Sequence, residues 1–303
     1  MNKYNRNRYG KTAFSISGLI KLPVVLMWMK QPQSYLIRWG KHILPSSWAN
    51  QVRNQLLYWR YADKNRRFVA THPDLNLPPL PFLAEIFKPD YTAYVEQGSA
   101  TVAAIMPLIK PYLSANAKNA LDWGCGTGRL TTHLQKLFAS LQWYACDVRS
   151  DMIQWNQNNL AHINFAITQQ EPPLPFQHVK FDLIIGFSVF THIPAALQQA
   201  WLNALSENLA DDGIVLFTTH GSAYQQHLSA KQQSVLMELG YWDNHTGNAG
   251  SRSRAIYHHA SKFHTIIEQY MDVLSWYDGA KYPSLIGGQD IWICKKKVPQ
   301  LRD

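Results

Sequence analysis

The stretch Leu121-Asp-Trp-Gly-Cys-Gly-Thr-Gly-Arg129 decides how the rest of the chain is interpreted. It joins an apolar run at 119–123 to a helical pattern at 130–137. Its glycines stand at every second position from 124 to 128, so the backbone can turn tightly and approach a ligand without obstruction by Cβ atoms. A dinucleotide-binding loop would place glycine or alanine at position 129, where this chain has arginine. The loop therefore disfavours a pyrophosphate ligand.

Two carboxylates near this loop indicate what the ligand carries. Asp122 directly precedes the glycines, which suits a ligand with a cationic amino group. Asp147 ends the next strand, 23 residues after Gly124, where a carboxylate can accept hydrogen bonds from both hydroxyls of a ribose. An amino group, a carboxylate that the glycines contact and a ribose together describe S-adenosylmethionine. The alternative interpretation is an ordinary tight turn followed by a solvated aspartate.

Short apolar segments alternate with amphipathic helical segments along most of the chain. Strands are predicted at 119–123, 142–146, 163–167, 182–187 and 214–218, and helices at 130–137, 150–160 and 195–209. A helix at about 100–113, kinked or broken by Pro107 and Pro111, should precede the first strand. A helix at 260–270 and a strand pair at 271–276 and 290–295 should close the chain. This alternation predicts an α/β fold, a Rossmann-like, seven-stranded, mainly parallel sheet with helices on both faces.

With these motifs, the chain resembles the class I S-adenosylmethionine-dependent methyltransferases over about 77–297. A narrower resemblance rests on Ser188-Val-Phe-Thr-His192 and Thr218-Thr-His-Gly221. These two motifs are similar to those of bacterial methyltransferases often found with glycosyltransferases in surface-polysaccharide clusters. The resemblance implies an enzyme of polysaccharide biosynthesis that O-methylates a sugar or glycan intermediate, lipid-linked intermediates included.

The resemblance also implies a cofactor site at the carboxyl ends of the first strands. The residues expected in it are Asp122, Gly124, Cys125, Gly126, Gly128, Asp147, Val148, Gln169, Phe187 and Ser188. Many class I enzymes place an aspartate after the third strand, where it accepts a hydrogen bond from the adenine amine. Here the corresponding stretch is 168–175, and Gln169 or Gln170 could accept that bond instead.

Two histidines are candidates for the base in methyl transfer. His192 lies just beyond the fourth predicted strand and His220 at the end of the fifth, and ligands of open α/β sheets bind at these carboxyl ends. A hydroxyl acceptor loses a proton, which a histidine with a pKa near ~6.5 can take. Either histidine could instead only hydrogen-bond a loop or cap a helix. Tyr257, His258 and His259 are expected at the acceptor pocket or on the surface. We find no metal-ligand spacing and predict a metal-free site.

Charge is distributed unevenly along the 303 residues. Residues 1–67 contain 13 Lys and Arg and one Asp, a net charge of +12, whereas the remainder contains 16 basic and 19 acidic residues, a net charge of −3. We predict a basic, aromatic helical extension with a linker at 1–75 and a class I methyltransferase domain at 76–303. The extension has apolar residues at helical spacing, namely Trp48, Val52, Leu56 and Trp59. It could contact an anionic membrane surface, bind RNA or pack on the catalytic domain.

The cysteines and the apolar runs indicate the compartment. The three cysteines form no CxxC pair, which fits a reducing cytosol rather than a secreted disulfide scaffold. No run reaches the ~18 apolar residues that a spanning helix needs, and the run at 19–29 is interrupted and lacks a cleavage site. We expect a cytoplasmic protein with peripheral contact at the inner membrane surface.

The alternative functions are methylation of another small metabolite or of RNA, and a catalytically silent scaffold. A nicotinamide oxidoreductase is disfavoured by Arg129.

Overall fold

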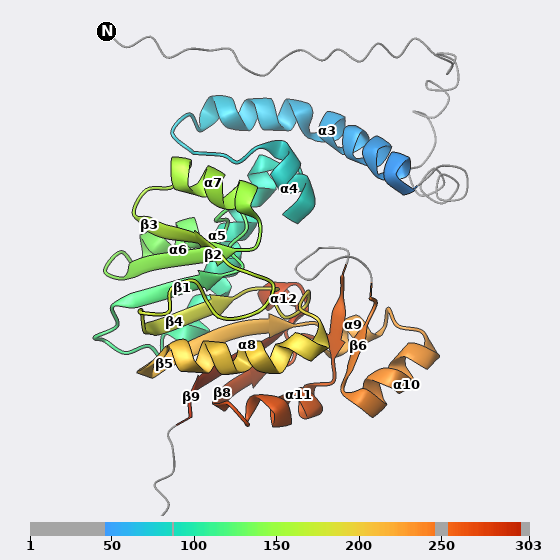
Figure 1. Ribbon diagram of the computed structural model, residues 1–303. Helices are drawn as coiled ribbons and strands as arrows, with labels where there is room; N and C mark the ends of the chain where they lie inside the picture. Colours follow the sequence, from blue (N-terminus) through green and yellow to red (C-terminus); the bar gives the residue numbers. More distant parts are fainter. Residues whose placement is uncertain (1–45, 87, 246–253, 298–303) are drawn as a thin grey trace, which may run out of the picture. The chain divides into compact units, whose positions relative to one another are not determined.

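The computed structural model describes residues 46–86, 88–245 and 254–297 (Figure 1). The chain divides into two compact units, residues 1–57 and 58–303. Its elements in chain order are α3 (Ser46–Thr71), α4 (Leu80–Ile86), α5 (Tyr91–Ile109), β1 (Asn119–Trp123), α6 (Thr131–Leu137), β2 (Gln142–Asp147), α7 (Ser150–Asn159), β3 (Ile163–Ile167), β4 (Phe181–Gly186), α8 (Ala195–Asn208), β5 (Leu209–Thr219), α9 (Ser222–Gln225), α10 (Ala230–Leu239), β6 (Tyr241–Asp243), β7 (Ile256–His258), α11 (Ala260–Ile267), β8 (Met271–Tyr277), α12 (Pro283–Ile286) and β9 (Asp290–Lys296).

Seven strands form one sheet in the order β3-β2-β1-β4-β5-β9-β8. Strands β1 to β5 run parallel to one another, whereas β9 is antiparallel to both β5 and β8. The strand order reverses between β1 and β4, and ligands of open α/β sheets bind beyond such a reversal. The glycine loop follows β1 at this point. The predicted seven-stranded, mainly parallel sheet is therefore confirmed.

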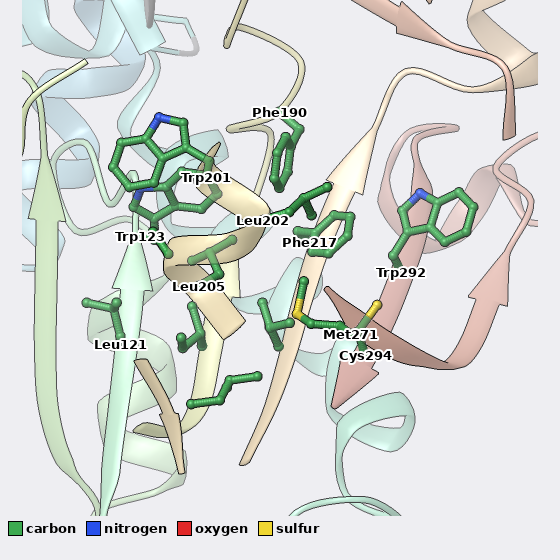
Figure 2. Close-up of a cluster of buried hydrophobic side chains, with 14 of the residues drawn as sticks. Leu121, Trp123, Phe190, Trp201, Leu202, Leu205, Phe217, Met271, Trp292 and Cys294 are labelled. Carbon is green, nitrogen blue, oxygen red and sulfur yellow. The ribbon is translucent and has the colours of Figure 1, made fainter. Parts of the chain in front are cut away.

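Alternate side chains of the central strands build two hydrophobic layers, as expected for strands covered on both faces. On one face, Leu121 and Trp123 of β1 pack in a cluster with Trp201 of α8 (Figure 2). The same cluster includes residues of α11. The ring centroids of Trp123 and Trp201 are 4.9 Å apart. On the other face, Ala120 of β1 packs with α5 and α6. The two layers hold the ends of β1 to β4 in place around the glycine loop.

Helix α5 begins nine residues before the predicted start at residue 100, so that prediction was wrong. Asp90 caps the helix, since its Oδ1 accepts a hydrogen bond from the backbone N–H of Ala93 at 3.1 Å. Gly98 weakened the helical pattern in the sequence, but a Cβ there would lie only 3.0 Å from the carbonyl oxygen of Arg129. Close packing therefore leaves little room for a side chain at this position of the helix. Pro107 is accommodated within the last turn rather than ending the helix before it.

A second, two-stranded sheet was not predicted. Strands β6 and β7 have three residues each, too few to reveal a period-two pattern in the sequence. The small sheet is connected to the main sheet by hydrogen bonds between β7 and the segments that follow β4 and β5. The backbone N–H of Ile256 donates to the carbonyl of Thr191 at 2.9 Å, and that of His258 donates to the carbonyl of His220 at 2.9 Å. This small sheet therefore borders the carboxyl ends of the strands.

Helix α3 confirms the helical pattern of the predicted extension and continues to Thr71. Asn65 fastens its later turns, donating from Nδ2 to the carbonyl of Pro89 at 2.9 Å and accepting from the N–H of Tyr91 at 2.9 Å. Trp59 is 70% exposed, so it does not cover the catalytic core as the packing interpretation requires. The apolar run at 19–29 and the side chains of Trp48 and Val52 lie outside the described residues. Among the helices described, none combines the length and apolar character needed to cross a membrane.

Candidate active site

A cavity of about 530 Å³ lies at the carboxyl ends of β1 to β4. Its walls include the segments 122–126, 147–149, 168–170 and 187–189, each of which contains the end of one of these strands or follows it directly. All the residues predicted to bind the cofactor line this cavity except Gly128. A Cβ at Gly128 would lie 2.7 Å from Cδ1 of Leu160, and its φ is +73°. Gly128 therefore shapes the loop rather than the cavity wall.

Asp147 lies in the cavity wall and is already hydrogen-bonded to the backbone. Its Oδ2 accepts from the N–H of Gly126 at 2.8 Å and its Oδ1 from the N–H of Arg149 at 2.9 Å. Each carboxylate oxygen has a second lone pair, so both could still accept from a ligand hydroxyl. Burial raises the pKa of Asp147, and the two backbone N–H groups oppose that shift.

Asp122 and Arg129 bring opposite charges to the same wall. Asp122 is buried and accepts a hydrogen bond from Oγ1 of Thr131 at 2.5 Å. Burial raises the pKa of Asp122 to about 6, and the nearby Asp147 adds to the shift. Burial lowers the pKa of Arg129, and this shift is opposed by Tyr94 and Asp122, which raise the pKa. A carboxylate and a guanidinium side by side suit the zwitterionic end of an amino acid. Sequence reasoning used Arg129 only against a pyrophosphate ligand and missed this placement.

The segment after β3 supplies polar groups at the adenine end expected from the sequence. Gln169 is exposed and lines the cavity, as does Gln170, whose carbonyl accepts from Nε1 of Trp201 at 3.0 Å. Thr168, which sequence reasoning did not select, is buried, and its Oγ1 has no hydrogen-bond partner among the described residues. A buried hydroxyl without a partner usually serves a ligand or a water. The charged wall, the Asp147 carboxylate and this hydroxyl are groups that could pair with the amino-acid end, ribose and adenine of S-adenosylmethionine.

Ser188 joins the cavity to two later parts of the chain. Its φ is +60°, an uncommon conformation for a residue with a side chain. Its backbone N–H donates to Oγ1 of Thr218 at 2.8 Å, and its Oγ accepts from Nε2 of Gln289 at 2.7 Å. Oγ1 of Thr218 in turn donates to Oε1 of Gln289 at 2.6 Å. This closed set of hydrogen bonds holds the backbone conformation of Ser188 beside the cavity.

The two candidate bases occupy different places. His192 lines the cavity, and its Nδ1 lies 2.6 Å from the carbonyl oxygen of Arg254. His220 is not part of the cavity wall, and its ring stacks on Tyr224 with centroids 4.2 Å apart. Burial, together with the nearby His192, lowers the pKa of His220 to about 4. The structure therefore puts His192 nearer the cofactor cavity than His220.

The later histidines fall outside the cavity. His258 is buried in the core, where its Nε2 lies 3.1 Å from Oε1 of Gln198. Burial lowers the pKa of His258 to about 3. His259 occupies the N-cap position of α11. Within the described part of the chain, no group of three or more His, Cys, Asp or Glu side chains is arranged to hold a metal ion.

Comparison with known proteins gives relatives for this site and fold. Residues 94–264 match the model of a family described as a methyltransferase domain. The chain is 32% identical over 151 residues to a malonyl-[acyl-carrier protein] O-methyltransferase of Bacillus cereus, covering 49% of this chain and 55% of the relative. It is also 32% identical over 123 residues to that of Bacillus cytotoxicus, covering 40% and 42%. The chain thus spans about half the length of the curated relatives it matches.

Two solved structures are similar at low identity. A methyltransferase from Methanosarcina mazei is 14% identical with a TM-score of 0.48, covering 63% of this chain and 98% of that one. A glycopeptide N-methyltransferase complexed with S-adenosylmethionine is 12% identical with a TM-score of 0.47, covering 65% and 94%. The family model, however, spans more than half of this chain and includes the glycine loop. The chain therefore belongs to the methyltransferase-domain family.

Proposed function

We propose that this enzyme O-methylates a hydroxyl group of a sugar or glycan intermediate, with His192 as the base. One observation carries the proposal: His192 lines the cofactor cavity while its Nδ1 faces the carbonyl oxygen of Arg254 at 2.6 Å. A carbonyl oxygen only accepts, so Nδ1 carries the proton and Nε2 holds the lone pair of the neutral ring. A neutral imidazole in this wall is suited to take the proton of a hydroxyl acceptor.

The contacts to the cofactor form part of the proposal. Asp147 accepts hydrogen bonds from the ribose hydroxyls, while Asp122 and Arg129 bind the amino and carboxylate groups. Thr168 and Gln169 border the adenine. When bound, S-adenosylmethionine supplies a methyl group whose bond to sulphur breaks with the electron pair remaining on sulphur. The acceptor oxygen forms the new bond to carbon, and its proton moves to Nε2 of His192.

An aromatic cluster beside His192 supports a sugar acceptor. The ring of His220 is 4.2 Å from that of Tyr224 and 5.4 Å from that of Tyr257, and Trp242 lies 5.4 Å from Tyr257. All four side chains are half-buried. Aromatic rings with polar edges offer a flat apolar face together with hydrogen-bonding groups, which suits the apolar face and hydroxyls of a sugar ring.

The curated relatives favour a second candidate, methylation of a carboxylate. Their name says that they act on malonyl-[acyl-carrier protein]. A carboxylate is already ionised at neutral pH and needs no base. The two candidates therefore differ in whether turnover depends on His192, and in whether the product is an ether or an ester.

Transfer from methyl-labelled S-adenosylmethionine tests the proposal. The full-length enzyme is incubated separately with sugar nucleotides, extracted lipid-linked glycans and malonyl-loaded acyl carrier protein. We expect label in a sugar-containing pool that survives mild alkali, because methyl ethers resist conditions that hydrolyse methyl esters. His192→Gln should then lose ~10²–10⁴-fold in turnover, whereas His178→Gln, at an exposed site, should not. Label only in malonyl-loaded carrier protein, released by alkali, would contradict the proposal.

We further propose that the basic extension makes peripheral contact with an anionic membrane. Arg60, Lys64 and Arg67 follow one another at helical spacing on α3 and line a shallow hollow together with Phe68. Lys64 also pairs with Asp90 at 3.0 Å, which holds this part of the helix. Basic side chains on one helix face suit lipid headgroups. The division of roles between 1–75 and 76–303 stays a prediction.

A further inference from the structure

An ion pair joins the two sides of the β6–β7 hairpin at the end where its connecting loop begins. Asp243, the last residue of β6, is 3% exposed in its side chain, and Arg254, two residues before β7, is 15% exposed. Nε of Arg254 donates to Oδ2 of Asp243 at 3.1 Å, and Nη2 donates to the same oxygen. Oδ1 of Asp243 also accepts from the backbone N–H of His245 at 2.7 Å. Burying two charges costs free energy, so a pair retained here is better explained by the geometry that it holds than by stability.

The ion pair fixes the conformation of the backbone at Arg254 and Ala255, the two residues that precede β7. Ala255 donates its N–H to Oδ1 of Asn244 at 3.0 Å, and Asn244 donates its own N–H to the carbonyl of Ala255 at 3.2 Å. With the guanidinium fastened to Asp243 on one side, the peptide group after Arg254 is restrained on both sides. Its carbonyl oxygen is the atom that accepts from Nδ1 of His192.

We propose that Asp243 and Arg254 are positioning residues that hold His192 in the tautomer with its proton on Nδ1. The inference rests on the proposed function, because that tautomer matters if Nε2 of His192 takes the acceptor proton. The acceptor O–H bond breaks, and its electron pair forms the bond to the methyl carbon as the carbon–sulphur bond breaks with its own pair left on sulphur. The acceptor proton binds Nε2. The Nδ1 proton stays hydrogen-bonded to the Arg254 carbonyl, which stabilises the imidazolium.

A second histidine provides an internal reference. Nε2 of Gln198 donates to the carbonyls of Phe190 and Ile193, so its Oε1 can only accept, and Nε2 of His258 must be the donor. His258 is therefore held in the opposite tautomer, with its proton on Nε2. Because it ends β7, it also reports whether the hairpin remains folded.

Nitrogen NMR of the full-length protein labelled with ¹⁵N-histidine tests the proposal without an acceptor. His192→Gln and His258→Gln identify the two signals by their loss. We expect the Nδ1–H form for His192 and the Nε2–H form for His258 above pH 7. In Asp243→Asn and Arg254→Met, the tautomer ratio of His192 should fall about tenfold toward a mixture, the change expected for one weakened hydrogen bond, while His258 stays unchanged. Arg254→Lys, which keeps the positive charge, should have a tautomer ratio of His192 between those of Arg254→Met and the wild type.

Matched outcomes separate the possibilities. Asp211→Asn removes the carboxylate of an exposed ion pair with Lys296 and should alter neither signal. An Nε2–H form of His192 in the wild type overturns the proposal, and so does an unchanged His192 ratio in both variants. If Asp243→Asn and Arg254→Met also change the His258 signal, the hairpin itself is disturbed in these variants. The proposal is then judged on the tautomer of His192 in the wild type and in Arg254→Lys. If the tautomer responds as expected but His192→Gln keeps full turnover, the proposed base fails while the positioning role stands.

Discussion

Asp147 and Gly126 are joined by a hydrogen bond of 2.8 Å from the backbone N–H of the glycine loop to the carboxylate at the end of β2. The carboxylate expected to bind the ribose therefore also holds the loop that faces the rest of the ligand. Its oxygens accept from two backbone N–H groups before any ligand arrives, which fixes their direction. The conformation of the loop, and the ribose binding proposed for this site, thus depend on one side chain.

Replacing Asp147 by alanine should weaken binding of S-adenosylhomocysteine by ~2 kcal/mol or more, because both ribose hydroxyls and the Gly126 N–H lose a partner. Asp147→Asn should fall between alanine and wild type, since an amide oxygen can still accept from Gly126. Isothermal titration calorimetry measures both. Asp211→Ala, at an exposed carboxylate, serves as the control. Unchanged affinity in Asp147→Ala would remove this residue from the cofactor site.

Arg129 should distinguish ligands with and without the amino-acid end. Arg129→Met should lower the affinity for S-adenosylhomocysteine by ~10–100-fold, because a carboxylate loses a charge-assisted hydrogen bond. Binding of 5′-methylthioadenosine, which has no carboxylate, should change little. Competition binding with the two ligands measures the ratio. Equal weakening of both would mean that Arg129 only supports the loop and Tyr94.

His258 should make the folded state sensitive to acid. Burial lowers its pKa to about 3, whereas an unfolded chain titrates near ~6.5. Above pH 6.5 both states are neutral and His258 contributes no pH dependence. Below it, the unfolded state binds a proton that the folded state does not, so the free energy of unfolding falls by ~1.4 kcal/mol per pH unit. Urea unfolding between pH 7 and pH 5 should show a shallower slope for His258→Gln. The exposed His178→Gln should keep the wild-type slope.

The extension should bind anionic vesicles and release them as salt rises. Each basic residue near such a surface contributes roughly 1 kcal/mol, and residues 1–57 contain nine Lys and Arg without an acid. A chain beginning at Tyr58 keeps Asn65 and its hydrogen bonds to Pro89 and Tyr91, so it should still bind cofactor but sediment less. Replacing Arg60, Lys64 and Arg67 by glutamine in that shortened chain should abolish its remaining vesicle binding. Neutral vesicles are the control, and equal sedimentation of all three chains would rule out the anchor.

The sequence by itself determined the sheet and most of the residues that meet around the cavity. Strand β1, the glycine loop and Asp147 could be predicted because their signals are local: apolar runs, glycines at fixed spacing and an acid at a strand end. Parallel strands bring their carboxyl ends to one edge, so these local signals also predicted which segments would meet.

Only the tertiary structure decided which histidine lines the cavity and what holds it. His192 meets the Arg254 carbonyl 62 residues later, through a hairpin whose strands are too short to show a pattern. His258 resembled a pocket residue in the sequence, yet packing placed it in the core. The placement of Arg129 near Asp122 involves the packing of α5, which comes close to the backbone of Arg129 at Gly98. Contacts between distant segments follow from packing of the whole domain, and no local pattern records them.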